Sequence, residues 1–389
     1  TEVYHFDARL RWNGYTNQAG QFTRRAIDRD GNLRAIIDPA GHAAQTLFDE
    51  RANPVLMIDA EGAATQIEWH PVWALPLAIV DPLGQATRYD YDERGNLVAE
   101  TDPAGAKTTY KLDQRGLVVA VVDANGGEKR LSYNDAGQVT SYTDCSGHTT
   151  TFSYDANGWL LAAVAPNGEV GSYVYDAAGH VVKQTLPDGV SETYDNDVLG
   201  RMLSVTSAQG ARTTFSYEAD GLVAQRVDAL GHTLRYQYDT ARRLQALVNE
   251  NGARYTFAYD ELDRVREETR FDGTRSLYRY DEGSQLLEQV DAPGTPEAVS
   301  LHYVRDAVGR VLERVTHQTR LRYVYDQAGQ VVQAVALHSG VKVDRQYDQA
   351  GRVVEECVTA GTRSFSTRYE YDPLGNLLQT ILPDGTRLG

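Results

Sequence analysis

The stretch Tyr91-Asp92-Glu93-Arg94-Gly95-Asn96-Leu97 decides the fold, because it recurs along the chain as Tyr-Asp-x-x-Gly followed by an apolar residue. Its first position, here called the anchor, falls every 21 residues from 91 to 280. Weaker copies place further anchors at Phe6, Ile27, Phe48, His70, Arg305, Tyr325, Tyr347 and Tyr371. These 18 units fill the 389 residues, and a fixed period of this size is the signature of a repeat architecture.

Each unit has the pattern of two short strands and two turns. A second aromatic residue precedes the anchor by two positions, as in Tyr89 and Tyr91, so both rings lie on one face of a strand. The anchor Asp and the Gly after it predict a hairpin turn, here called the anchor turn. A second turn, such as 102–105 (Asp-Pro-Ala-Gly), brings the chain back and is called the return turn. With no helical periodicity, the sequence predicts an all-β chain of repetitive antiparallel hairpins.

The number of strands predicts a curved shell. About 36 strands at about 4.8 Å each make a ribbon of roughly 170 Å, or one turn of a wide spiral roughly 55 Å across. The position eight residues after the anchor varies from Ala99 and Ser141 to Lys183 and Glu267. A conventional core face would not carry Lys and Glu, so we expect a single curved sheet over a two-layer sandwich.

We interpret residues 1–389 as one continuous array, and as a fragment of a longer chain that begins with Thr1 inside a strand-like segment. Two segments depart from the repeat. Residues 69–80 form a degenerate unit with two Trp and two Pro, which predicts a local packing feature or a contact surface. Residues 291–304 lengthen another unit to 25 residues, which predicts an extended loop or a change in curvature.

Composition limits the classes of partner. The 38 Lys and Arg against 54 Asp and Glu give a formal charge of −16, which argues against nucleic acid and anionic membranes. Cys145 and Cys357 lie ten units apart and indicate neither a disulfide framework nor a metal site. No apolar run reaches transmembrane length, and residues 1–20 lack the core of a signal peptide. We therefore expect no membrane insertion by this segment.

The 21-residue Tyr-Asp-x-x-Gly-x-Leu pattern, with its Asp-Pro-x-Gly turns, resembles the Rhs/YD-repeat proteins. This family includes shells of bacterial polymorphic toxins, the C subunit of insecticidal toxin complexes and the teneurin shell. The resemblance implies a hollow β-cocoon around a C-terminal toxin domain, which is not part of this sequence. It also implies secretion or delivery from a bacterium that holds the effector in its cytoplasm before export. A type VI secretion spike with a PAAR domain and a chaperone are implied partners, and interbacterial competition is the implied setting.

The residues do not indicate catalytic, cofactor-binding or metal-binding sites. His42, His148, His180 and His232 each follow a turn Gly and show no metal-ligand spacing. Each turn supplies one Asp, whereas calcium needs several oxygen ligands around one ion, so the Asp residues are interpreted as turn caps. Asp372, in a segment that resembles the shell ending of the family, fits equally well in one more unit and is assigned no catalytic role.

Two alternatives stay open. Rows of tyrosines on a curved sheet would also suit a surface-exposed adhesion or carbohydrate-binding repeat protein, located at the cell surface. Two units make four strands, the size of a propeller blade, although odd and even units do not alternate. The sequence thus favours a non-enzymatic shell, with self-association through unpaired edge strands expected.

Overall fold

The computed structural model describes residues 2–389. Thr1, which we expected to lie inside a strand-like segment, is outside the described residues. These residues form a single sheet of 37 strands without any helix. Each strand pairs antiparallel with the next strand along the chain, as β9 with β10 and β10 with β11. The all-β prediction of repeated hairpins in one curved sheet is therefore confirmed.

The strands up to the end of the twelfth unit are β1 Val3–Phe6, β2 Trp12–Thr16, β3 Phe22–Ile27, β4 Leu33–Ile37, β5 Ala43–Phe48, β6 Pro54–Ile58, β7 Ala64–Trp69, β8 Pro76–Val80, β9 Ala86–Tyr91, β10 Leu97–Thr101, β11 Lys107–Leu112, β12 Val118–Val122, β13 Glu128–Tyr133, β14 Val139–Thr143, β15 Thr149–Tyr154, β16 Leu160–Val164, β17 Val170–Tyr175, β18 Val181–Thr185, β19 Ser191–Asn196, β20 Met202–Thr206, β21 Arg212–Tyr217, β22 Val223–Val227, β23 Thr233–Tyr238 and β24 Leu244–Val248. The remaining strands are β25 Arg254–Tyr259, β26 Val265–Thr269, β27 Arg275–Tyr280, β28 Leu286–Asp291, β29 Val299–Arg305, β30 Val311–Val315, β31 Arg320–Tyr325, β32 Val331–Ala336, β33 Val341–Tyr347, β34 Val353–Ala360, β35 Arg363–Tyr371, β36 Leu377–Ile381 and β37 Arg387–Leu388.

Both kinds of turn close in the same way. In the anchor turn after β9, the Asp92 N–H bonds to the Asn96 carbonyl and the Gly95 N–H bonds to the Asp92 carbonyl. Gly95 has a φ of 83°, which a residue with a Cβ rarely adopts, and this explains the Gly of the repeat. A bulge follows between Leu97 and Ala99, so the second strand starts one residue out of register with its partner.

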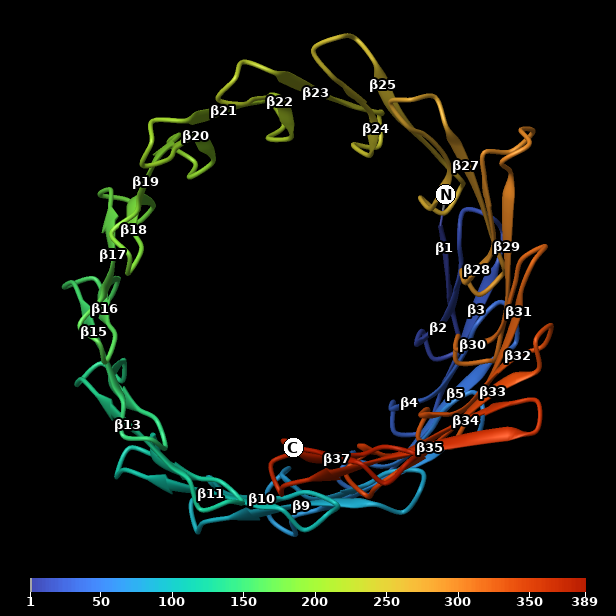
Figure 1. Ribbon diagram of the computed structural model, residues 1–389, viewed down its shortest axis with the longest axis horizontal. Coiled ribbons are helices and arrows are strands. Elements are labelled where there is room, and N and C mark those ends of the chain that lie inside the picture. The colour runs from blue at the N-terminus through green and yellow to red at the C-terminus, as the bar shows by residue number, and fades with distance from the viewer. Residues whose placement is uncertain (1) are drawn as a thin grey trace.

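The ribbon winds into a spiral of one and a half turns. Figure 1 shows it running round a wide centre, with β29–β35 returning over β1–β5. The Ala307 N–H donates to Glu61 at 2.7 Å, and the Asn125 amide donates to Asp372 at 2.8 Å. These partners are 246 and 247 residues apart, which corresponds to twelve units per turn, so the last six units stack on the first six.

This geometry corrects the predicted single turn. Twelve units contain 24 strands, and at about 4.8 Å each they close a ring no narrower than roughly 37 Å, with strand tilt widening it further. The solvent-accessible surface is 23166 Å² for a chain of 43.0 kDa. A compact globule of that mass exposes about 15,000 Å², so the wall is one sheet thick and has no conventional core.

The most buried residues explain the variable position eight after the anchor. Ala78, Ala99, Ala120, Ala246 and Ser204 are at most 4 % exposed, although no second layer covers them. Ion pairs or hydrogen bonds between the two flanking strands span all of these except Ala78: Lys107, for example, reaches Asp90 at 2.9 Å across the strand of Ala99. Where the position is Glu313, its carboxylate pairs with Arg320 at 2.6 Å and Arg322 at 2.7 Å. Small residues such as Ala99 thus lie under a bridge, whereas Glu313 and Glu267 take part in one.

The two irregular segments keep the ladder intact. In the segment 69–80, Trp69 pairs with Pro76, as Tyr91 pairs with Leu97, so the anchor of this unit is Trp69 and the assignment to His70 is wrong. His70 and Trp73 stack at 4.5 Å, and Trp73 packs on the next anchor turn at Gly95, which makes the segment a packing feature. Within 291–304, the predicted extended loop lies between β28 and β29, which still pair with each other.

Candidate functional site: the clamps and seam of the wall

The anchor hydroxyl fastens each unit to the one before it. The Tyr133 hydroxyl donates to the carbonyl of Val118, the first residue of β12, at 2.7 Å. The same bond, 2.7 to 3.0 Å long, is made by Tyr91, Tyr154, Tyr175, Tyr217, Tyr238, Tyr259, Tyr280, Tyr325, Tyr347 and Tyr371. Burial raises the pKa of Tyr91, so this donor keeps its proton. We call this bond the tyrosine clamp.

Three anchors that lack a tyrosine keep a donor. Trp69 donates from Nε1 to the Pro54 carbonyl at 2.7 Å, and Asn196 donates to the Val181 carbonyl at 3.1 Å. Arg305 donates from Nε to the Leu286 carbonyl, also at 3.1 Å. The sequence did not predict this function, because the repeat was defined by Tyr-Asp and neither the indole, the amide nor the guanidinium matches that pattern. Their shared ability to donate a hydrogen bond was the available signal.

The anchor Asp caps its own turn, as predicted. Asp92 Oδ1 accepts from the backbone N–H groups of Arg94 and Asn96 at 2.9 Å, and Oδ2 accepts from the Asn96 amide at 2.9 Å. The Asn96 side chain, followed by the backbone donors, lowers the pKa of Asp92. Both carboxylate oxygens already accept hydrogen bonds within the turn. Within residues 2–389 no group of three or more His, Cys, Asp or Glu residues could hold a metal ion.

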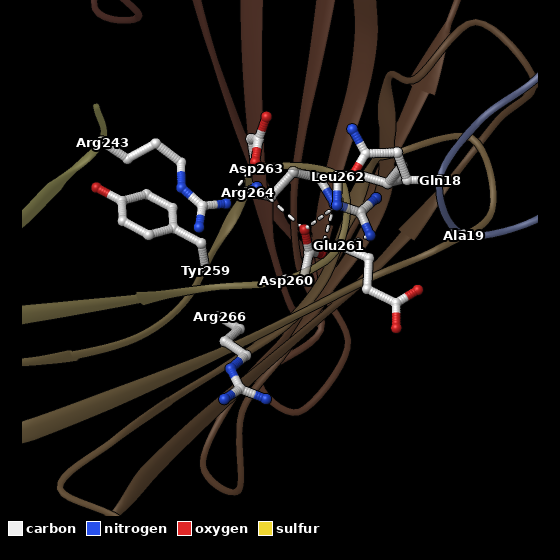
Figure 2. A pocket seen from close by; sticks show the side chains of 10 residues that line it. All are labelled: Gln18, Ala19, Arg243, Tyr259, Asp260, Glu261, Leu262, Asp263, Arg264 and Arg266. Atoms are coloured by element: carbon white, nitrogen blue, oxygen red, sulfur yellow. Dashed lines mark hydrogen bonds and ion pairs between the residues drawn. The ribbon is translucent and has the colours of Figure 1, made fainter. Parts of the chain in front are cut away.

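An arginine five residues after the anchor links successive anchor turns. Arg352 donates from Nε to Asp348 at 2.7 Å and from Nη1 to the Asp372 carbonyl of the next turn at 2.9 Å. Its guanidinium also lies 5.2 Å over the centre of the Tyr371 ring, a cation–π arrangement. The same stacking on the next anchor ring is made by Arg201, Arg243, Arg264 and Arg310. Figure 2 shows Arg243 beside Tyr259.

We call the line where the second turn of the spiral meets the first the seam. Along it, anchor turns of the last six units face return turns of the first six. In Figure 2, Gln18 and Ala19 come from the first unit of the chain, and the other eight side chains come from residues 243–266, where the second turn of the spiral begins. A cavity of about 570 Å³ lies between them, and two further seam cavities have volumes of about 440 and 390 Å³.

A polar cluster braces the sheet just before the long loop. Glu268 accepts hydrogen bonds from the hydroxyls of Tyr255 at 2.8 Å and Tyr278 at 3.0 Å. Burial, and then the bond to Glu268, raises the pKa of Tyr278 to about 12. Ser276, which is fully buried, donates to Asp291 at 2.7 Å. The polar groups of the cluster bond one another, which describes a structural brace better than a reactive site.

The histidines and cysteines named in the sequence analysis are not brought together. His42, His148, His180 and His232 each contact the Asp that opens their own turn, at 3.0 to 3.3 Å. Cys145 and Cys357 are free thiols. Among the described residues there is no helix with the length and apolar character needed to cross a membrane.

A single sheet wound into a spiral and clamped between successive YD units defines a YD-repeat shell scaffold. Residues 172–382 match the teneurin YD-shell model, which is more than half of the chain, so the chain belongs to this family. The RHS repeat model matches residues 75–107, 91–128 and 133–170. These are families of shell repeats and not of catalytic domains. The curated proteins contain no match to this chain.

Solved structures share the fold. The crystal structure of TcdB2-TccC3 without its hypervariable C-terminal region has a TM-score of 0.80 at 15% identity, over 97% of this chain and 24% of that one. A second crystal structure of TcdB2-TccC3 gives a TM-score of 0.76 at 15% identity, over 98% of this chain and 25% of that one. The Tc holotoxin pore of Photorhabdus luminescens gives 0.77 at 14% identity, over 97% and 26%. The chain thus spans about a quarter of the length of these structures.

Proposed function

We propose that this chain is a structural segment of a toxin shell that encloses a C-terminal toxin domain, helps to deliver it and has no enzymatic activity of its own. The observation that carries the proposal is the wall itself, a single sheet that runs round a wide centre for one and a half turns. Membership of the YD-shell family and the fold likeness to TcdB2-TccC3 support it.

The proposal includes the organisation of the chain. Residues 1–389 are one continuous array of 18 units, with the degenerate unit at 69–80 and the insertion at 291–304. The array belongs to a longer protein, since the structures that it resembles are about four times its length. The cargo is the protein's own toxin domain, which the curved wall separates from the producing cell.

Delivery is proposed in general terms. The similar structures are toxin complexes, which supports release of the cargo from a bacterium. Type VI secretion, a PAAR spike and a chaperone rest on the family resemblance alone, and a Tc complex is a different delivery system. A carbohydrate-binding role receives less support, because eleven anchor tyrosines use their hydroxyls in clamps and a sugar would need such donors.

Limited proteolysis of the full-length protein tests this function. The expected result is that the downstream domain resists protease while the shell is intact and is digested once the shell has been denatured. The matched control is the same downstream domain expressed without the shell. Equal digestion rates for the attached and the isolated domain would rule out enclosure.

A further inference from the structure

The wall contains two kinds of contact that differ greatly in number. Along the ribbon, every strand from β1 to β37 is hydrogen-bonded to its neighbour in an antiparallel ladder. Across the seam, residues 2–389 make two hydrogen bonds, Ala307 with Glu61 and Asn125 with Asp372. The ladder therefore holds the ribbon together, while the seam alone fixes one turn of the spiral against the next.

The seam lets the turns approach each other but buries little. The third residue after the anchor is small or apolar in the anchor turns that face the seam: Leu262, Gly283, Val308, Ala328, Ala350 and Leu374. In the first six units, whose anchor turns lie on the opposite edge of the ribbon, the same position is mostly charged: Arg9, Asp30, Arg51, Arg94 and Arg115. A Cβ on Gly283 would lie 3.3 Å from the Asp38 carboxylate, so bulk there would push the turns apart.

The apolar side chains at the seam are nevertheless exposed. Val308 and Leu374 keep 36% and 47% of their surface in contact with solvent. The three cavities on the seam separate the contacts from one another. Hydrophobic stabilisation, which scales with buried area, is correspondingly small there.

We propose that the seam is the line along which this shell opens: the second turn lifts away from the first while every strand ladder stays intact. Such uncoiling widens the ring and gives an extended chain a route through the wall. Two exposed hydrogen bonds of ordinary strength favour the closed form by roughly thirtyfold, so a measurable open population follows. The inference rests on the geometry of the wall and holds whether or not a cargo is enclosed.

Electron paramagnetic resonance distances between spin labels test the proposal. Labels are placed at Gln18→Cys and Glu261→Cys, which flank the cavity of Figure 2 on opposite sides of the seam. The background carries Cys145→Ser and Cys357→Ser, because both native thiols are free. A second labelled pair, Ser146→Cys and Asn167→Cys, reports on neighbouring return turns within one ladder.

Removal of both seam bonds by Glu61→Ala and Asn125→Ala should add a long-distance component to the pair across the seam and leave the ladder pair unchanged. Glu93→Ala, an exposed change in an anchor turn outside the seam, should alter neither pair. The melting temperature should stay the same in all variants, because the ladders are intact. A single narrow distance across the seam in the Glu61→Ala/Asn125→Ala variant, or a fall in its melting temperature with the distance unchanged, would overturn the proposal.

Discussion

The tyrosine clamp makes a prediction that can be tested within one strand. Tyr236 and Tyr238 lie two residues apart on β23 and therefore share a face of the sheet. The Tyr238 hydroxyl donates to the Val223 carbonyl at 3.0 Å, and this is the bond that Tyr238→Phe removes. The loss of one such bond costs about 1 kcal/mol, equivalent to about a fivefold change in an opening equilibrium.

Hydrogen exchange measures this effect locally, which suits an array whose units contact mainly their neighbours. Amides of β22 and β23 should exchange about five times faster in Tyr238→Phe than in the wild-type protein. Tyr236→Phe is the control, because it removes a hydroxyl from the same strand without removing a clamp. Equal protection in the two variants would refute the view that the anchor hydroxyl fastens one unit to the next.

Three further changes test other parts of the wall. Asp92→Ala removes the cap of an anchor turn and should lower the melting temperature. Asp92→Asn should lower it less, because Asn134 caps an equivalent turn. Equal melting temperatures of Asp92→Ala and the wild-type protein would contradict the cap. Because the folded protein lowers the pKa of Asp92, the stabilisation by its carboxylate is complete above the ordinary pKa of 3.8 and is lost as the pH falls through the lower folded pKa. A melting temperature that stays constant when the pH is lowered below about 4 would contradict this. Ala246 is fully buried, so Ala246→Leu should lower the free energy of unfolding by about 1–3 kcal/mol, as measured by denaturant unfolding. An unchanged unfolding midpoint would contradict the view that the space under the bridge is filled.

The repeat predicts local structure well because each turn is specified by its own residues. Asp92 and Gly95 close their turn through bonds within five residues, and the period of 21 places each strand. The assignment of an anchor to His70 failed for a local reason. Trp69 substitutes for tyrosine as a donor, and a search for Tyr-Asp does not detect that equivalence.

The curvature could not be predicted in the same way. Small twists between successive strands add up over 24 strands, and no single residue fixes their sum. The seam partners Glu61 and Ala307 are 246 residues apart and carry no shared motif. The third residue after the anchor does not mark the seam either, because Ala136, Ala178 and Leu199 hold this position in anchor turns that do not face it.

Small-angle X-ray scattering tests the central claim most directly, because a hollow spiral and a compact fold distribute their mass differently. A compact globule of 389 residues has a radius of gyration of about 21 Å. The spiral predicts a clearly larger value and a pair-distance distribution with a shortage of mass near the centre. A radius near 21 Å with the distribution of a solid particle would contradict the shell.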